Sequence, residues 1–407
     1  MLKQQPFIPV VLGANIGTYS IVRSFHEAYN VKSISLSKQT AGPIDKSSII
    51  VPMTEKSMGE EDVLLAKLKE IGSMYPDQPK ILIGSNDWHI ESIVDFHGKL
   101  GDDWVIPYVD NQTLQKIIHK TSFYDICEKV GVPYPKYTYL NDDASPGDDV
   151  NFSFPVVIKP TDRALYESTD FEGKKKVFIC ENREELEDVT ARLKKAGLHK
   201  SVILQEYVPG DDSAMRILTL YVGQDGETKL ASYGQVLLED HTPGGRGNPL
   251  AIRTFSNDEV VEHAKKIVEH TGFTGIANFD IKYDQKDGKY KFFELNPRLG
   301  RSNYYMTVGG HNPVEYYVEE HLQKREITPV KAENEKLYTV VPKKLLLKYI
   351  ADSELKKTIK RMFKENKAIN PMFNFSVEKS PKRRFYVYAS TMNFYKKFKQ
   401  HPPFEKE

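Results

Sequence analysis

The sequence predicts an α/β domain at the N-terminus, an α+β domain after it and a basic extension at the C-terminus. Three observations support this prediction. Strand and helix patterns alternate over the first 110 residues, as they do in a doubly wound parallel sheet. Residues 111–325 instead show several strands for each long helix. From residue 343 to 407 the chain has 17 Lys and Arg against 6 Asp and Glu, a local charge of +11.

Length and composition are typical of a globular protein with more than one packed unit. The chain has 407 residues, of which 40% are hydrophobic and 28% charged. No apolar run approaches the ~20 residues that span a bilayer, and Gly13 ends the first apolar run before a signal peptide could form. Two cysteines, Cys127 and Cys180, suit a reducing compartment. We therefore expect a cytoplasmic protein with no transmembrane segment and no nucleic-acid partner.

The N-terminal domain is predicted over residues 1–110. Its elements are expected at 7–12 (strand), 18–28 (helix), 31–36 (strand), 60–74 (helix) and 80–84 (strand). The loop Gly13-Ala14-Asn15-Ile16-Gly17 joins the first strand to the first helix, and its glycines would let an anionic group approach a helix N-terminus. A tight turn needs glycine with or without a ligand, so both interpretations stay open.

The second domain is predicted over residues 111–325. Helical spacing of Leu114, Ile117 and Phe123 marks its start, and the Pro/Gly/Asp-rich stretch 141–151 is predicted to be a linker. Further strands are expected at 154–158, 177–180, 202–207, 215–221, 230–238, 276–283 and 290–295, with helices at 183–196 and 258–271.

Two segments of this domain have features of a nucleotide site. Lys159 ends an apolar strand, where an ammonium group without an acidic neighbour is costly unless an anion such as phosphate meets it. The alternative is a surface lysine whose stem covers apolar residues. The strand 202–207 turns polar and breaks at Pro209-Gly210. Such an edge can offer backbone groups to an adenine, and the adjacent Asp211 and Asp212 could accept the ribose hydroxyls. An acidic turn also forms without a ligand, so both interpretations stay open.

Three oxygen-bearing side chains lie near the ends of two neighbouring strands. Asp280 lies in an apolar strand, and Glu294 and Asn296 point to one face of the next strand because strand side chains alternate. Hard oxygen ligands suit a magnesium ion shared with substrate phosphates. Arg298 and Arg301 would stabilise charge on a transferring phosphoryl group. A structural ion-pair network is the alternative for this segment taken alone.

The order of these motifs resembles the ATP-grasp superfamily. The chain has Lys120 opening a helix, the strand lysine, the hinge QEYVPGDD, an aspartate strand and ELNPRLGRSN. The resemblance implies an ATP-grasp fold with an N-terminal doubly wound (pre-ATP-grasp) domain at 1–110. The ATP-grasp domain would span 111–325, with a lid subdomain at about 150–210, and the basic C-terminal extension 326–407.

The resemblance also implies a role for each motif residue. ATP phosphates are expected to bind Lys120 and Lys159. The adenine hinge is expected at Gln205, Glu206 and Val208, the last two acting mainly through their backbone, and the ribose at Asp212. Two Mg²⁺ ions, or Mn²⁺ in their place, are expected at Asp280, Glu294 and Asn296. Arg298 would support the γ-phosphate.

A closer resemblance covers nearly the whole chain. The opening PVVLGANIGTYSIVRSFHEAY, the segments FEGKKKV and GDDSAMR, the loop LLEDHTPGGRGNP and NFDIKYDQKDGKYKFFELNPRLGRSNYY are similar to the D-aspartate ligases of Gram-positive bacteria. That family adds D-aspartate through its β-carboxylate to the lysine side chain of the peptidoglycan precursor. The resemblance implies an ATP-dependent carboxylate–amine ligase that works through an acyl phosphate, with an amino-acid carboxylate substrate and a muropeptide precursor as amine acceptor.

Two loops and the basic extension are expected to take part. Residues 161–176, which include the cations Lys174 to Lys176, lie where the superfamily keeps a lid that excludes water. His241, in the loop 240–247, either contacts a substrate, as a candidate general base, or caps the loop. The cluster Lys382, Arg383 and Arg384 is expected to meet the diphosphate of a nucleotide-linked acceptor, with a solvated face or a peripheral membrane contact as alternatives.

Two other functions stay open at this point. One is an ATP-grasp ligase of another amino acid or a dipeptide outside the cell wall. The other is a non-catalytic nucleotide-binding regulatory protein, which would not need the complete set of Asp280, Glu294, Asn296 and Arg298.

Overall fold

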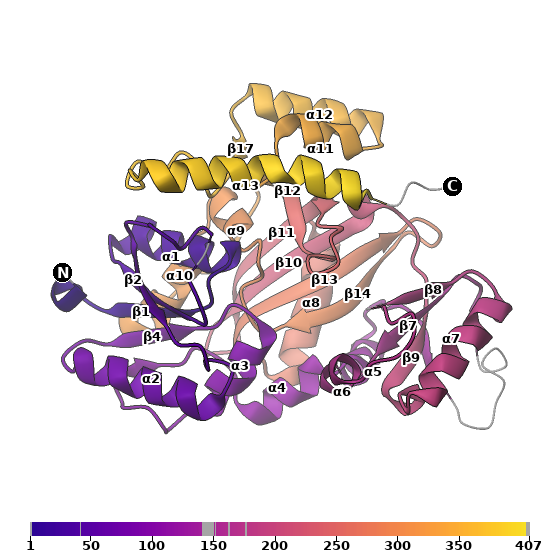
Figure 1. Ribbon diagram of the computed structural model, residues 1–407, viewed down its shortest axis with the longest axis horizontal. Helices are drawn as coiled ribbons and strands as arrows, with labels where there is room; N and C mark the ends of the chain where they lie inside the picture. The colour runs from indigo at the N-terminus through magenta and orange to yellow at the C-terminus, as the bar shows by residue number, and fades with distance from the viewer. Residues whose placement is uncertain are drawn as a thin grey trace. The chain divides into compact units, whose positions relative to one another are not determined.

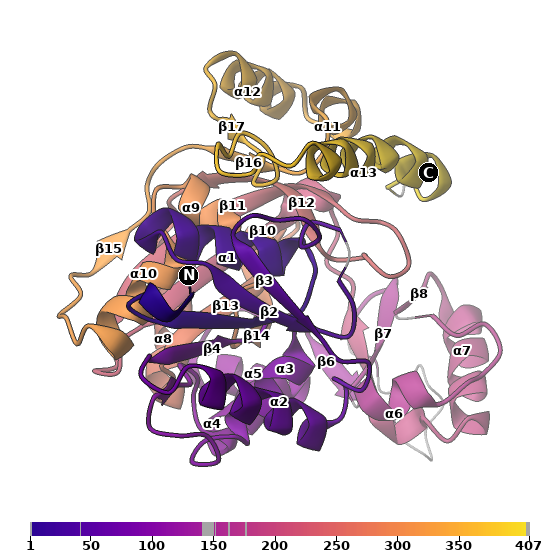
Figure 2. The same ribbon diagram turned by 60° about the vertical axis from the view of Figure 1, so that its left-hand side comes forward.

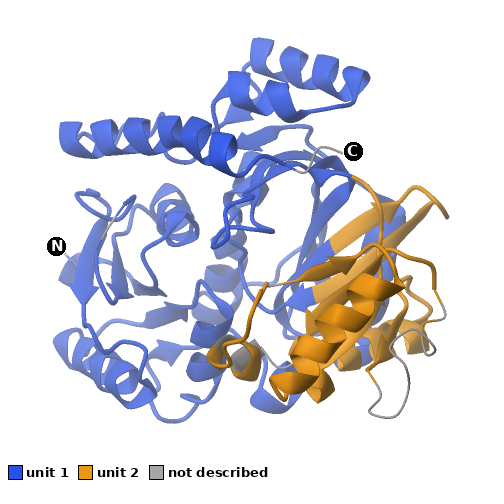
Figure 3. Cartoon of the chain, turned by 45° about the vertical axis from the view of Figure 1, so that its right-hand side comes forward, with its two compact units in different colours: residues 1–116, 211–280, 295–407 blue, residues 117–210, 281–294 orange. Residues whose placement is uncertain are grey.

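The structure, a computed structural model, describes residues 2–403 apart from 41, 141–149, 151, 162 and 176 (Figure 1). The predicted linker at 141–151 therefore lies almost wholly outside the described residues. The chain forms two compact units, shown in different colours in Figure 3. Unit 1 consists of residues 1–116, 211–280 and 295–407, and unit 2 of residues 117–210 and 281–294. The domain bounds expected from the sequence stay a prediction.

The N-terminal part of unit 1 has the expected doubly wound sheet. Its five strands are all parallel and lie in the order β3-β2-β1-β4-β5. The strands are β1 Ile8–Leu12, β2 Ser33–Ser37, β3 Ile50–Thr54, β4 Lys80–Ile83 and β5 Trp104–Val105, and the helices are α1 Ile16–Tyr29, α2 Glu61–Met74 and α3 Asp87–Val94.

Helices cover both faces of this sheet because neighbouring strand residues point in opposite directions. Val11 of β1 belongs to the apolar core that contains Phe25 of α1. Val10 belongs to a separate core with Leu64 of α2. Figure 2 shows α1 on one side of the sheet and α2 and α3 on the other.

An eight-stranded sheet has the order β14-β13-β10-β11-β12-β16-β17, with β15 beside β11. Its strands are β10 Met215–Val222, β11 Thr228–Glu239, β12 Pro249–Phe255, β13 Gly275–Asp284, β14 Lys289–Asn296, β15 Val330–Lys331, β16 Leu337–Thr339 and β17 Ala368–Ile369. The unit boundary falls inside β13, after Asp280, and inside β14, after Glu294. Helix α8 has the predicted bounds, Asp258–Thr271, and packs on β10 and β11.

Unit 2 contains a four-stranded antiparallel sheet in the order β6-β9-β7-β8. Its strands are β6 Tyr137–Tyr139, β7 Val156–Pro160, β8 Phe178–Cys180 and β9 Val202–Glu206, and its helices are α5 Lys120–Val130, α6 Arg163–Ser168 and α7 Arg183–Lys195. Helix α4, Asn111–Ile118, crosses the unit boundary. Leu186 and Leu193 of α7 pack on Phe178 and Leu204 of the sheet.

The C-terminal part of unit 1 is mostly helical. Its helices are α9 Tyr304–Val308, α10 Pro313–Tyr317, α11 Lys343–Tyr349, α12 Ser353–Lys364 and α13 Pro381–Gln400, the long yellow helix of Figure 1. Short 3-10 helices lie at Leu2–Gln4, His199–Ser201 and Asp212–Ala214, and a π-helical turn at Val318–Leu322. Within the described part of the chain, no helix is both long and apolar enough to cross a membrane.

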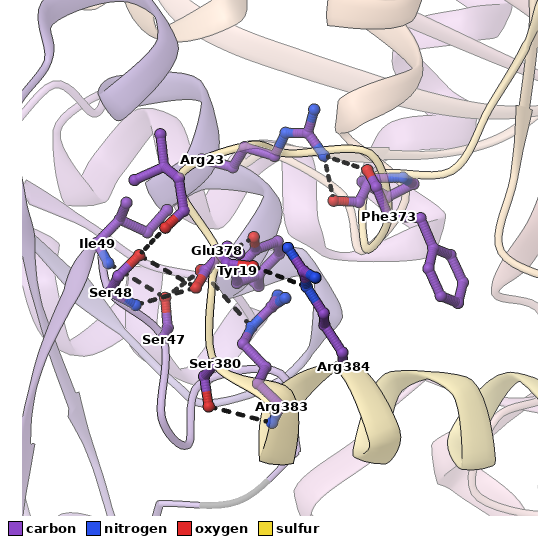
Figure 4. A network of polar contacts seen from close by, with 12 residues as sticks. Tyr19, Arg23, Ser47, Ser48, Ile49, Phe373, Glu378, Ser380, Arg383 and Arg384 are labelled. Carbon is purple, nitrogen blue, oxygen red and sulfur yellow. Dashed lines mark hydrogen bonds and ion pairs between the residues drawn. The ribbon is translucent and has the colours of Figure 1, made fainter.

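Glu378 fixes this C-terminal part to helix α1 and to the loop before β3 (Figure 4). Its buried carboxylate accepts hydrogen bonds from Ser47 Oγ at 2.6 Å, Ser48 N at 3.0 Å and Tyr19 Oη at 3.2 Å. Arg383 is only 3% exposed, and its Nε lies 3.6 Å from Glu378 Oε1. The expectation that Lys382, Arg383 and Arg384 form one anion-binding surface was wrong at Arg383, because Glu378 and the Tyr19 ring hold its guanidinium inside unit 1.

The mixed α/β and α+β architecture expected from the sequence is confirmed. Among the elements that were not predicted are β3, α3, β12, β16 and the helices α9 to α13.

Candidate active site

The residues singled out in the sequence fall into two groups, one in each unit. Unit 2 contains Lys120, Lys159, Gln205, Glu206, Val208 and Glu294. Unit 1 contains Asp212, His241, Asp280, Asn296, Arg298 and Arg301.

In unit 2, Lys120 and Glu294 form an ion pair. Lys120 begins α5, and its Nζ donates a hydrogen bond to Glu294 Oε2 at 2.7 Å. Both side chains remain partly open to solvent, at 25% and 38% exposure. A partly exposed pair of this kind can be rearranged at little cost when a ligand arrives, because surface ion pairs contribute only about 0–1 kcal/mol.

Lys159 is close to the same strand. It pairs with Ile203 in the antiparallel contact between β7 and β9, so the backbone fixes its position. Its Nζ lies 4.7 Å from the centroid of the Phe293 ring. Both predicted phosphate lysines therefore contact consecutive residues of β14, Phe293 and Glu294.

The side chains at the end of β9 are held by other parts of unit 2. Gln205 is buried, and its Oε1 accepts a hydrogen bond from Tyr124 Oη at 3.0 Å. Glu206 accepts hydrogen bonds from Lys291 Nζ at 3.0 Å and from Lys136 N at 3.1 Å. The Glu206 carboxylate is thus already occupied by two donors of the protein itself.

Lys291 was not predicted from the sequence to be a residue of the site. Besides Glu206, its ammonium contacts Asp284 Oδ2 at 2.8 Å. Burial acts to lower the pKa of Lys291, but the hydrogen bonds to Asp284 and Glu206 outweigh it, and the pKa is raised. Lys291 therefore stays charged and fixes the hinge strand β9 to β14.

Val208 follows this hinge and is 3% exposed. Its backbone makes no hydrogen bond to any of the described residues. Backbone groups that the fold itself leaves unpaired are costly unless water or a ligand meets them. The role of the Val208 backbone as an adenine contact stays a prediction.

In unit 1, Arg298 is held by a residue that sequence analysis missed. Its Nε donates to Asp87 Oδ1 at 2.5 Å, and its Nη2 lies 3.4 Å from Asn296 Oδ1. Asp87 begins α3, just after β4. Ligands of open α/β sheets bind at the carboxyl ends of the strands, so the position of Asp87 after β4 could have indicated it.

The charge of Arg298 also acts on His89. Burial, together with Arg298, lowers the pKa of His89 to about 4, although Asp87 opposes this change. His89 is therefore neutral at physiological pH. Arg298 is the only cation of this trio, and its partner is Asp87.

The predicted metal ligands have suitable donor atoms. Asp280, Glu294 and Asn296 offer two carboxylates and an amide oxygen, which are hard donors that Mg²⁺ accepts. Within the described ranges, no group of three or more His, Cys, Asp or Glu side chains could form a metal site of its own. The donor set fits a magnesium ion that takes its remaining ligands from water and substrate phosphates.

Asp212 and His241 were expected to act separately, but they contact each other. His241 Nε2 lies 2.9 Å from Asp212 Oδ2, which also accepts a hydrogen bond from Glu239 N at 2.8 Å. Burial acts to lower the pKa of His241, but the hydrogen bond and charge of Asp212 outweigh it, and the pKa is raised. Asp212 therefore favours the protonated form of His241.

Arg301 differs from Arg298 in having no charged partner. No hydrogen bond or ion pair joins it to any described residue, and its backbone packs closely on Gly17, where an added Cβ would lie 3.0 Å from Arg301 Cα. The Asn15 side chain accepts hydrogen bonds from Gly17 N and Thr18 N, and so it begins α1 at Ile16. The glycine-rich loop thus packs against the segment that contains both arginines.

The region predicted as a lid packs on itself through aromatic residues. The Tyr166 and Phe171 rings lie edge to face with centroids 5.8 Å apart, and Tyr166 Oη donates to Lys175 O at 2.5 Å. Lys174 Nζ lies 5.7 Å from the Tyr166 ring centroid. Lys176, the last predicted cation of this segment, lies outside the described residues.

Comparison with known sequences relates the chain to enzymes that use ATP. Residues 251–307 match the family model of the carbamoyl-phosphate synthase L chain, ATP binding domain. The chain is 33% identical to a D-aspartate ligase of Enterococcus faecium (strain Aus0004), over 98% of both proteins.

Solved structures with the same fold have low sequence identity to the chain. The biotin carboxylase domain of Hydrogenobacter thermophilus 2-oxoglutarate carboxylase, crystallised with MgADP, is 13% identical with a TM-score of 0.61, covering 82% of this chain and 73% of that one. An L-amino acid ligase of Bacillus licheniformis is 13% identical with a TM-score of 0.53, covering 80% and 78%. These likenesses show the fold.

Proposed function

Since this chain belongs to the D-aspartate ligase family of ATP-grasp carboxylate–amine ligases, we propose that it joins the β-carboxylate of D-aspartate to the lysine side chain of a peptidoglycan precursor. The observation that carries the proposal is the 33% identity over 98% of both chains. The chain is an ATP-dependent ligase that forms carbon–nitrogen bonds, which excludes the non-catalytic regulatory protein considered above. We place the reaction in the cytoplasm.

ATP is assigned to the residues of unit 2 and to Asp212. We assign its phosphates to Lys120 and Lys159, which contact consecutive residues of β14. The adenine is assigned to the backbone of Glu206 and Val208 and to Gln205, and the ribose to Asp212. Because Glu294 neutralises Lys120 in the structure, the arriving phosphates would compete with a carboxylate for the same ammonium.

The metal site is assigned to Asp280, Glu294 and Asn296. We propose that they hold two Mg²⁺ ions, for which Mn²⁺ can substitute. When bound, the metal offsets negative charge on the phosphates during transfer. Arg298 adds a fixed positive charge for the same purpose, and Asp87 sets the direction of its guanidinium.

The reaction follows from the two functional groups that it joins. A carboxylate oxygen of the amino acid forms a bond to the γ-phosphorus, the bond from that phosphorus to the bridging oxygen breaks, and ADP leaves. A neutral amine then attacks the acyl carbon, the bond to the phosphate oxygen breaks, and the amine proton is released with inorganic phosphate. The predicted lid at 161–176, whose described part contains the packed pair Tyr166 and Phe171, would exclude water from the acyl phosphate.

One assay tests this function. The protein is incubated with ATP, Mg²⁺ and each member of an amino-acid panel, with and without a lysine-containing muropeptide precursor, and ADP and phosphate release are measured. We expect release that depends on D-aspartate and rises with the acceptor. Release that depends on a different acid and not on D-aspartate would refute D-aspartate as the substrate. The protein would then be a ligase of that other amino acid. No release with any acid would contradict the ligase itself.

A further inference from the structure

Unit 1 contains a cavity of ≈ 410 Å³ that none of the assigned nucleotide or metal residues lines. Helix α13 forms one wall, with Tyr386, Ser390 and Lys397 among its lining residues. Asn15, from the loop between β1 and α1, and Arg301 line it from other directions. We call this space the α13 cavity. Its volume is within the range of roughly 300–1,000 Å³ that is typical of small-ligand sites.

The lining of the α13 cavity favours an anionic, polar ligand. Arg301 and Lys397 supply positive charge, whereas no Asp or Glu lines the cavity. Lys397 Nζ forms an ion pair with the buried Asp240 at 3.7 Å, whereas Arg301 has no ion-pair partner among the described residues. A partly buried cation without a partner, such as Arg301, is costly unless an anion meets it. Ser390 and Asn393 add hydrogen-bonding groups from α13.

The cavity also adjoins the segment assigned to the chemistry. Arg301 follows Arg298 by three residues, and Arg298 is fixed by Asp87. Gly17 packs against the Arg301 backbone. A ligand bound at Arg301 would therefore lie beside the segment that we assign to phosphoryl transfer.

The wall formed by α13 is held in place before any ligand binds. The Glu378 network fixes the start of the helix to Tyr19 and Ser47, and Arg23 Nη1 donates to Pro371 O at 2.5 Å (Figure 4). A site whose walls are already ordered loses less entropy on binding. Further along, Tyr386 lies against Gly42, where an added Cβ would be 3.0 Å from its Oη.

We propose that the α13 cavity binds the amine acceptor, a peptide that carries a free lysine side chain together with carboxylate groups. The peptide carboxylates pair with Arg301 and Lys397, and its backbone hydrogen-bonds to the polar side chains of α13. The cavity has room for more than one small amino acid, which favours the acceptor over the acid substrate. This proposal rests on the proposed ligase function and gives the C-terminal extension a part in it.

The first test fills the cavity. Ser390→Trp places a large ring in it, whereas Ala389→Trp puts the same ring on the neighbouring exposed residue, which does not line it. Each variant is assayed with ATP, D-aspartate and one of two nucleophiles, a lysine-containing muropeptide or hydroxylamine, which traps the acyl phosphate as a hydroxamate and is too small to need the cavity.

We compare the ratio of kcat/KM for the muropeptide to kcat/KM for hydroxylamine. We expect Ser390→Trp to lower this ratio roughly 10-fold or more below its wild-type value, because only the peptide has to enter the cavity. Ala389→Trp should leave this ratio at the wild-type value. An equal loss for both nucleophiles, or a ratio unchanged in Ser390→Trp, would overturn the proposal. Absence of hydroxamate in the wild type would instead contradict the proposed function, so the two failures can be told apart.

The second test removes charge. Lys397→Gln and Lys396→Gln delete equal charges from adjacent residues, of which only Lys397 lines the cavity. We expect a rise of roughly 10-fold in KM for the muropeptide in Lys397→Gln alone, the size of one lost charge-assisted contact. Equal effects of the two substitutions would show that the basic helix attracts the muropeptide only through its overall charge. This result would overturn an acceptor site in the cavity.

Discussion

Lys120 Nζ donates a hydrogen bond to Glu294 Oε2 at 2.7 Å, and so a residue assigned to ATP phosphate contacts a residue assigned to magnesium. The Glu294 carboxylate gives Lys120 the negative charge that an ATP phosphate would bring. The Lys120 ammonium gives Glu294 the positive charge that a metal ion would bring. Neither charge is left unbalanced when ATP is absent, and the pair can separate when both ligands arrive.

Substitution of Glu294 tests the metal assignment. Glu294→Gln should lower kcat by roughly 10²-fold or more, because the transition state loses charge neutralisation. Stability should change little, since the Glu294 side chain is 38% exposed. Steady-state rates over a magnesium titration and urea unfolding measure the two effects. Glu262→Gln, which removes a carboxylate paired with Lys265 at 2.8 Å, is the control. Equal rates for Glu294→Gln and wild type at every magnesium concentration would refute the assignment.

Lys159 should be needed for ligation and not for folding. Lys159→Ala removes a cation that we assign to an ATP phosphate, so we expect ATP-dependent ligation to be abolished. The circular dichroism spectrum and the unfolding midpoint should stay close to those of the wild type. Lys195→Ala, at an exposed position on α7, removes the same charge from unit 2 and should remain active. Normal turnover in Lys159→Ala would remove this lysine from the site.

Asp87 is predicted to act as a positioning residue through Arg298. Asp87→Asn keeps the side-chain size but removes the charge that fixes the guanidinium, so kcat should fall more than the affinity for ATP. The same change should shift the pKa of His89 further below about 4, because Asp87 opposes its lowering. An NMR titration of His89 measures this effect. Asp95→Asn, at the other end of α3, is the control. An unchanged His89 titration would mean that the Asp87 carboxylate does not raise the pKa of His89.

The pair Asp212 and His241 should make stability depend on pH. The folded-state pKa of His241 lies above its ordinary value of 6.5. Its contribution to stability is therefore complete below pH 6.5 and is lost as the pH rises through the folded-state pKa. Urea unfolding from pH 6.5 upward should show a falling free energy of unfolding, with a smaller slope in Asp212→Asn. Asp211→Asn is the neighbouring control, and identical slopes in all three proteins would rule out the pairing.

Arg383 should matter for stability, unlike its neighbour Lys382. Arg383→Gln leaves the buried Glu378 without its guanidinium, and we expect a loss near the lower end of about 3–5 kcal/mol, because hydroxyl donors remain on the carboxylate. Lys382→Gln, on the exposed face, should stay within about 0.5 kcal/mol of the wild type. Urea unfolding compares the two, and equal stabilities would contradict the role of the network.

Much of the fold could be predicted where a local pattern decides the structure. Helix α8 has a regular apolar stripe and begins after Asn257, whose side chain caps it, and its predicted bounds are those of the structure. Helix α13 was missed because its apolar residues do not mark one buried face: Phe385 is 74% exposed and Tyr388 58% exposed, whereas Val387 is buried.

The site could be predicted in part, because its motifs are ordered along the chain. The partners of those motif residues were not predictable. Asp87 contacts Arg298 across 211 positions, and Arg383 is drawn inward by Glu378 and by Tyr19, a residue from the other end of the chain. Such contacts depend on which loops the topology brings together, and the spacing of residues within one segment does not predict them.

The contact between Tyr19 and Glu378 spans 359 positions, and this sets the order in which the chain can complete its structure during synthesis. The first sheet leaves the ribosome long before the segment that contains Glu378, so Tyr19 and Ser47 lack this partner until translation is nearly finished. Long-range contacts of this kind form late and leave nascent chains open to aggregation. A message cut short before Glu378 would encode every residue assigned to ATP and magnesium and yet yield a product that quality control should recognise as unfinished.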